Sequence, residues 1–294
     1  MGRRNIKQKA GSLIFRIYHY SIFSGLLHRM KQYAIFAIQK LHSILQAIST
    51  IPRRCGYADR RFKALRALKG QYMGKRCFII CTGPSLLISD LEKLENEYSF
   101  GMNSISLIHE KTRWKPDFYA IQDLSVFERI KESVYTTDNG QVFIPLEFSR
   151  HYVLPENWVM FHTSWAYHMY ELIYKTKYFA KFSRDCYATV YDGYSITYSI
   201  MQLAIYMGFT EIYLLGADSS YLGEKKHFIE HGTNDPTFQT ATDRLFSAYS
   251  VAKKFTDKNG IKVYNATRGG KLEIFPRVNL DELLKTSKKN KVNT

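Results

Sequence analysis

The chain has 294 residues, 45% of them hydrophobic and 15% aromatic, which is enough to bury a core in one large domain or in one domain with an appendage. Its net charge of +16 lies within residues 1–76, which hold 17 Lys and Arg and one acid, whereas residues 77–294 hold 25 of each kind. Its four cysteines form no C-x-x-C pair and no Cys/His cluster of zinc spacing, which excludes the usual zinc modules and favours a reducing compartment.

The basic N-terminal segment is predicted to be a helical arm over residues 1–70. Apolar residues recur there every three or four positions, as a helix with one apolar face requires: Phe23, Leu27, Met30, Ala34, Ile38, Leu41, Leu45 and Ile48. Basic residues interrupt this stripe, so no uncharged run reaches the roughly 18 residues that a membrane span needs. The segment lacks the features of a signal peptide and of a myristoylation site.

A basic amphipathic helix of this kind favours the surface of an anionic membrane. We therefore expect a cytoplasmic protein held peripherally at the inner face of the cell membrane by residues 1–60. The alternative is that the apolar stripe packs on its own domain or on another subunit of a homo-oligomer. We expect no nucleic-acid partner, because the stripe is too apolar for a solvated basic arm.

From residue 77 onward the pattern alternates between strands and helices. The expected strands are 77–82, 98–102, 117–122, 142–147, 157–162, 211–216 and 261–265. The expected helices are 86–97, 104–112, 193–208 and 243–258. This order predicts an α/β, Rossmann-like domain over residues 71–284, with a mostly parallel sheet and helices on both faces. Residues 285–294 are predicted to be a disordered tail.

The first strand of this domain runs into Thr82-Gly83-Pro84-Ser85. In a doubly wound sheet, ligands bind beyond the carboxyl ends of the strands, which we call the carboxyl edge. Gly83 lets the backbone turn sharply, Pro84 fixes the turn, and Ser85 is expected to cap a helix beginning at Leu86. Such a junction favours an anion such as a phosphate, although a turn without a ligand explains these four residues equally well.

Three further segments place polar residues and glycines on the same edge. They are Asn103 and Ser104 after strand 98–102, Gly193 and Ser195 at the start of helix 193–208, and Gly216 with Asp218 after strand 211–216. Each segment alone is ordinary turn chemistry, but four together predict a nucleotide or donor site. Tyr194, Tyr198 and Tyr213 are expected to fill the core, whereas Tyr221 is expected at the site.

In this order, T-G-P-S-L, G-M-N-S, D-G-Y-S-I and G-F-T-E-I-Y-L-L-G-A-D resemble bacterial sialyltransferases that use CMP-activated donors. The wider group includes the motility-accessory flagellin glycosyltransferases and the 6-hydroxymethylpterin pyrophosphokinase-like proteins. The resemblance covers about residues 75–280, and the closing segment I-K-V-Y-N-A-T-R-G-G-K-L-E-I-F-P is similar to the last strand and loop of that group. Thr82 stands where the sialyltransferases carry an Asn, which leaves the donor sugar open.

The resemblance implies a metal-independent glycosyltransferase that moves sialic acid, another nonulosonate or a Kdo-like sugar from a CMP-activated donor. We expect a membrane-associated acceptor, a glycan or glycolipid of a capsule or lipooligosaccharide. The sequence has no Asp-x-Asp metal motif, so we expect no metal and no cofactor. His227 is the first candidate for the base that deprotonates the acceptor, and His231 is the second, with Asp218 and Tyr221 beside them.

Two alternatives remain open from the sequence. The first is an ATP-dependent 6-hydroxymethylpterin pyrophosphokinase-like enzyme, whose ATP would lie on the same loop. It leaves the basic arm unexplained and needs carboxylates for magnesium beyond Asp218. The second is a non-catalytic nucleotide-sugar-binding assembly protein, although the intact Gly83, Ser85, Asn103 and Ser195 argue against a decayed site.

Overall fold

The computed structural model describes residues 3–55, 57, 60–136, 138–164, 178–219, 228 and 238–286. The chain divides into two compact units, residues 1–49 with 166–177, and residues 50–165 with 178–294. This division separates Ser49 from Thr50, and the arm predicted over residues 1–70 stays a prediction. Phe62 and Leu65 lie in the main core of the second unit and are fully buried.

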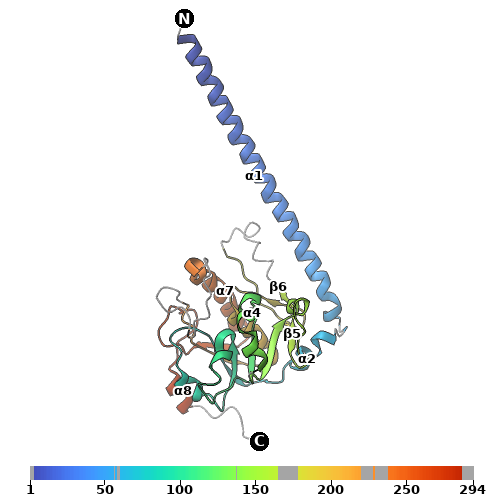
Figure 1. The fold of residues 1–294 in the computed structure, drawn as a ribbon, viewed down its shortest axis with the longest axis vertical. Helices are drawn as coiled ribbons and strands as arrows, with labels where there is room; N and C mark the ends of the chain where they lie inside the picture. Colours follow the sequence, from blue (N-terminus) through green and yellow to red (C-terminus); the bar gives the residue numbers. More distant parts are fainter. Residues whose placement is uncertain are drawn as a thin grey trace. The chain divides into compact units, whose positions relative to one another are not determined.

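The N-terminal helix α1 runs without interruption from Arg3 to Arg54 (Figure 1). Two arginines, Arg53 and Arg54, occupy its last turn, where cations complement the helix dipole. By length and composition alone, the stretch Ser24–Arg54 is long and apolar enough to cross a membrane. Only 6% of its 18-residue apolar segment is buried. The helical stripe predicted from residue 23 onward therefore lies on a helix that is longer than the stripe itself.

The second unit contains a seven-stranded sheet in the order β5-β4-β3-β2-β1-β8-β9, and every strand pairing in it is parallel. Its strands are β1 (Arg76–Ile80), β2 (Tyr98–Met102), β3 (Phe118–Ala120), β4 (Gln141–Pro145), β5 (Val159–Phe161), β8 (Glu211–Leu215) and β9 (Lys262–Asn265). The predicted Rossmann-like fold and all seven predicted strands are confirmed. Sequence reasoning missed a two-stranded parallel pair, β6 (Thr163–Ser164) with β7 (Val190–Tyr191).

Helices cover both faces of the sheet. They are α2 (Lys63–Ala67), α3 (Ile88–Glu92), α4 (Leu124–Thr136), α6 (Ile196–Met207), α7 (Phe238–Lys258) and α8 (Leu280–Thr286), with 3₁₀ helices η1 (Arg60–Phe62), η2 (Asn103–Ile108) and η3 (Leu146–Arg150). Two predicted helices differ. The helix expected over 86–97 is confined to α3, and the one expected over 104–112 is the 3₁₀ helix η2. The helix α8 also extends two residues into the predicted tail.

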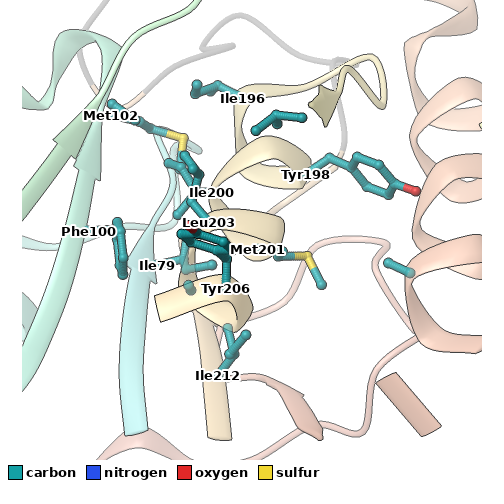
Figure 2. Packing of buried hydrophobic residues seen from close by; sticks show 14 of the residues in the cluster. Ile79, Phe100, Met102, Ile196, Tyr198, Ile200, Met201, Leu203, Tyr206 and Ile212 are labelled. Carbon is teal, nitrogen blue, oxygen red and sulfur yellow. The ribbon is translucent and has the colours of Figure 1, made fainter. Parts of the chain in front are cut away.

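Side chains of β1 alternate between the two faces, as a pleated strand requires. Cys77 and Ile79 pack in the cluster that contains α6 and α7, while Phe78 and Ile80 pack in the cluster that contains α3 and α8. Figure 2 shows the first of these clusters, with Ile200 and Leu203 of α6 lying beside the sheet. Because strands buried on both faces are apolar, β1 is hydrophobic from Cys77 to Ile80, after its partly buried first residue Arg76.

Candidate functional site

The strand order reverses at β1. From β1 the chain builds β2, β3, β4 and β5 on one side, and it then returns to place β8 on the other side of β1. The loops after β1 and β8 therefore meet at the carboxyl edge, at the switch point where ligands bind in open α/β sheets. The N–H of Gly83 donates to the carbonyl of Gly216 at 2.9 Å. The hydroxyl of Ser85 donates to Oδ2 of Asp218 at 2.8 Å.

Glycine is required at this contact for steric reasons. A Cβ on Gly83 would lie 1.9 Å from Oδ2 of Asp218 and 2.4 Å from the carbonyl oxygen of Gly216. Gly216 adopts a φ of +71°, and a Cβ there would lie 2.8 Å from the carbonyl oxygen of Cys81. These two loops can therefore approach each other only because neither position carries a side chain.

Ser85 has a different role from the one expected. Helix α3 begins at Ile88, its N-cap is Leu87, and no side chain caps it. The predicted capping role of Ser85 is wrong, because its hydroxyl is used by the carboxylate of Asp218. Pro84 is exposed in the turn. The carbonyl of Thr82 accepts the N–H of Phe228 at 2.7 Å, so a later part of the β8–α7 connection also contacts this loop.

Asn103 and Ser104 follow β2 directly. Asn103 has a φ of +47°, and its carbonyl accepts the hydroxyl of Tyr119 at 2.6 Å. Oδ1 of Asn103 and Oγ of Ser104 are buried and have no hydrogen-bond partner among the described residues. Since buried polar atoms are almost always paired, these two atoms are candidates to face a bound ligand.

Helix α6 starts above the ends of β1 and β2. Ser195 is its N-cap, and the Ser195 hydroxyl accepts the N–H of Thr197 at 3.2 Å. Oγ1 of Thr197 lies 3.4 Å from Sγ of Cys81 and 3.6 Å from Sδ of Met102. Gly193 is buried, and a Cβ there would lie 2.2 Å from the ring of Tyr198, so a packing need explains this glycine.

Sequence reasoning missed a polar network beside this helix. The hydroxyl of Ser199 donates to Oε1 of Gln122 at 2.7 Å, and Nε2 of Gln122 donates to Oδ1 of Asp192 at 3.3 Å. The same Asp192 oxygen accepts the N–H of Tyr194 at 2.9 Å. Gln122 follows β3 and Asp192 follows β7. Asn103 and Asp218 were chosen because they are polar residues shortly after a strand, and the same criterion selects Gln122 and Asp192.

Three non-glycine residues adopt a positive φ in the described part of the chain: Asn103, Tyr194 and Ser219. Each lies in a loop that follows a strand, β2, β7 and β8 respectively. A positive φ is costly for a residue with a side chain, and such strain concentrates at ligand sites. The backbone conformations therefore mark the same loops as the hydrogen bonds do.

A cysteine and two tyrosines near these loops belong to the core. Burial raises the pKa of the Cys81 thiol to about 12, so this sulfur is a neutral apolar group. Tyr213 stacks on Phe78 and Tyr264 at centroid distances of 5.1 and 5.2 Å. The hydroxyl of the buried Tyr198 donates to the carbonyl of Lys181 at 2.9 Å. The expectation that these tyrosines fill the core is confirmed.

The remaining predicted residues, Tyr221, His227 and His231, lie outside the described residues. Within the described ranges, no three His, Cys, Asp or Glu side chains are grouped as metal ligands. The described site therefore consists of Gly83, Ser85, Gly216 and Asp218, with the edge loops of Asn103 and Ser195 beside them.

A family model described as "6-hydroxymethylpterin diphosphokinase MptE-like" matches residues 56–224, more than half of the chain. No curated protein matches the sequence. Among solved structures, the MAf glycosyltransferase from Magnetospirillum magneticum AMB-1 is 14% identical, with a TM-score of 0.47 over 79% of this chain. This chain spans 39% of the length of that protein.

A second solved structure is the sialyltransferase CstII from Campylobacter jejuni in complex with the substrate analogue CMP-3FNeuAc. It is 14% identical to this chain, with a TM-score of 0.42, and the match covers 75% of this chain and 92% of that one.

Proposed function

The chain belongs to the 6-hydroxymethylpterin diphosphokinase MptE-like family, and we propose that it binds a nucleotide where its loops after β1 and β8 meet. One observation carries this proposal: the two loops touch at the switch point of the sheet, through Gly83, Gly216 and the Ser85–Asp218 hydrogen bond. Ligands of open α/β sheets bind beyond the carboxyl ends of the strands at such a switch point. The unpaired Oδ1 of Asn103 supplies an acceptor in the next loop.

The reaction proposed at this site is glycosyl transfer from a CMP-activated sugar, namely sialic acid, another nonulosonate or a Kdo-like sugar. A monophosphate leaving group is stabilised by backbone N–H groups and hydroxyls, and it needs no metal. The order of the four sequence segments, which resembles the bacterial sialyltransferases, supports this donor over a sugar diphosphate.

The proposed base is His227, with His231 as the second candidate and Tyr221 beside them. Histidine suits proton abstraction from an acceptor hydroxyl near neutral pH. The contact of Phe228 with Thr82 supports this choice, because Phe228 follows His227 directly in the sequence. Asp218 holds Ser85 in place, so we assign Asp218 to organising the site.

The proposed acceptor is a surface glycan or glycolipid at the inner face of the cell membrane. Support comes from α1, whose described part exposes large apolar side chains: Leu26, Leu27, Met30, Tyr33, Phe36, Ile38, Leu41, Ile44, Leu45, Ile48 and Ile51. Residues 1–58 contain no acid, so an anionic lipid surface complements the charge of this helix.

A panel of nucleotides tests the proposal by thermal shift and calorimetry, each with and without magnesium: CMP, CDP, UDP, GDP and ATP. A ligand that binds only the native state stabilises it by about 2.7 kcal/mol at 100 times its Kd. We expect CMP to raise the melting temperature without metal, and Asp218→Asn to weaken this shift. The family description favours one alternative, a diphosphokinase, and a shift produced by ATP with magnesium alone would establish it in place of glycosyl transfer.

A further inference from the structure

The loop after β9, residues 266–271, forms a third side of the contact between the loops after β1 and β8. Oγ1 of Thr267 accepts the N–H of Ala217 at 2.8 Å. The N–H of Lys271 donates to the carbonyl of Asp218 at 2.8 Å. The loop after β9 therefore binds two backbone groups next to the Asp218 side chain, the N–H of Ala217 and the carbonyl of Asp218.

Gly270 brings the loop into direct contact with Asp218. It has a φ of +74°, and a Cβ there would lie 2.7 Å from the carbonyl oxygen of Asp218 and 2.8 Å from its Cα. The neighbouring Gly269 also has a positive φ, +65°. Two consecutive residues in this conformation turn successive carbonyls away from the usual directions, and these carbonyls need a donor elsewhere.

Arg277 supplies that donor. Nη1 donates to the carbonyls of Thr267 at 3.0 Å and Gly269 at 2.6 Å, and Nη2 donates to that of Gly270 at 3.2 Å. Nε and Nη2 also contact Oε1 of Glu273 at 2.8 and 2.6 Å. A guanidinium holds several donors in one rigid plane, which the ammonium of lysine cannot reproduce.

The backbone that carries Arg277 is itself fixed to the sheet. The N–H of Asn265, the last residue of β9, donates to the carbonyl of Pro276 at 2.8 Å. The N–H of Val278 donates back to the carbonyl of Asn265 at 3.0 Å. Arg277 therefore projects from a segment hydrogen-bonded to the end of a strand and not from a free loop.

We propose that Arg277 is a positioning residue of the nucleotide site. It holds the carbonyls of Thr267, Gly269 and Gly270, this loop holds the backbone of Ala217 and Asp218, and the Asp218 carboxylate accepts the hydroxyl of Ser85. Loss of the guanidinium releases the loop after β9 and lets the Asp218 carboxylate move relative to Ser85. That the ligand is a nucleotide rests on the proposed function, whereas the contacts of Arg277 do not.

The test uses the full chain with Arg277→Lys and Arg277→Ala. Two matched controls accompany them. Glu273→Gln removes the charge of the carboxylate partner but leaves the three carbonyl contacts. Lys253→Ala breaks an exposed ion pair within helix α7, in which Nζ of Lys253 lies 2.9 Å from the carboxylate oxygens of Asp257. Hydrogen exchange of peptides covering 211–219 and 266–272 is followed together with the affinity for CMP.

Both Arg277 variants are expected to speed exchange at Ala217 and Lys271 by about tenfold or more, since each loses hydrogen bonds made by a charged donor. The strand amides of Ile212–Leu214 should keep their wild-type rate, and CMP affinity should fall by a similar factor. Glu273→Gln and Lys253→Ala should resemble the wild type in both measurements.

Wild-type exchange in Arg277→Lys would overturn the proposal, because charge alone would then suffice. Equal acceleration throughout β8 would also overturn it, since that result describes a general loss of stability. So would faster loop exchange with unchanged CMP affinity. A wild-type protein that binds no nucleotide refutes the proposed function instead, and the exchange arm still decides whether Arg277 holds the loop.

Discussion

Helix α1 and the loop after β8 differ in what restricts the residues that each position can carry. In α1 up to Ser49 the described side chains are largely exposed, and the hydrogen bond between the side chains of Gln32 and His28, at 2.9 Å, joins two residues of the same helix. In the loop after β8, Gly216, Ala217 and Asp218 each contact a residue far away in sequence.

The difference shows what substitution can change in each region. An exposed helix tolerates any residue that preserves helix propensity and the pattern of charge and apolar surface. The loops after β1, β8 and β9 tolerate almost none at their glycines, because Gly83, Gly216 and Gly270 all pack against backbone or carboxylate atoms. We therefore expect the proposed membrane binding by α1 to depend on summed charge and apolar area, and the proposed nucleotide binding at the carboxyl edge to depend on individual atoms.

Removal of residues 1–49 is the largest test of this contrast. The cut is placed before Thr50, which is 2% exposed, and before Arg53, which donates to the carbonyl of Ala188 at 2.8 Å. Eight Lys and Arg are lost, each contributing about 1 kcal/mol at an anionic surface, so binding to phosphatidylserine vesicles should disappear. Sedimentation with vesicles measures it, and circular dichroism checks that the second unit stays folded.

Salt sharpens the same experiment. A peripheral helix should leave anionic vesicles as ionic strength rises, because screening weakens its charges. Retention at high salt and on neutral vesicles would instead favour a membrane span, which Ser24–Arg54 is long enough to form. An unfolded or aggregated truncation would mean that the apolar stripe covers another protein surface.

The proposed base is the next test, and it concerns one atom and not a summed surface. Loss of a general base typically slows turnover by about 100- to 10,000-fold. His227→Ala should lose turnover in this range while its CMP affinity stays close to that of the wild type, and His231→Ala should lose less. The measurement is kcat beside Kd for both variants. A reversed order would make His231 the base, and normal turnover in both would exclude the pair.

The sequence predicted the elements whose signals are local. All seven strands of the main sheet were found because each is an apolar run bounded by turn residues. The helix α4 was missed although Val126, Phe127, Ile130 and Val134 have helical spacing and are buried. The pair β6–β7 was missed because two-residue strands carry no periodicity at all.

The site was predicted only as far as the chain order allowed. Gly83, Asn103 and Asp218 were predicted as candidates because each follows a strand, and parallel strands end at one edge. The bond between Ser85 and Asp218 joins residues 133 positions apart, and no local pattern indicates it. The same holds for Asp90, a fully buried carboxylate that binds the guanidinium of Arg268, 178 positions away.

Asn103 offers a smaller test at the carboxyl edge. Asn103→Ala and Asn103→Gly both remove the buried Oδ1, and each lost polar contact is worth about 1 kcal/mol, so CMP should bind about fivefold more weakly to both. The two variants should differ in stability, because glycine tolerates the φ of +47° and alanine does not. Calorimetry and urea unfolding separate the two effects, and unchanged affinity in both would remove Asn103 from the site.

The smallest effect concerns a buried histidine of the second unit. His109 is 7% exposed, and neither ring nitrogen has a hydrogen-bond partner among the described residues. Burial, and secondarily the charge of Lys115, lower the pKa of His109 from 6.5 to about 4, with Asp138 opposing them. Between these two values the unfolded chain binds more protons than the native state, so His109 makes the protein less stable as the pH falls from about 6.5 toward 4.

His109→Gln should therefore flatten the fall in the free energy of unfolding between pH 7 and pH 4.5, measured by urea titration at each pH. The same substitution at His28, an exposed residue of α1, is the matched control. If both variants keep the wild-type slope, His109 takes up protons in the native state as readily as in the unfolded chain. That result would remove this histidine from the acid sensitivity of the second unit.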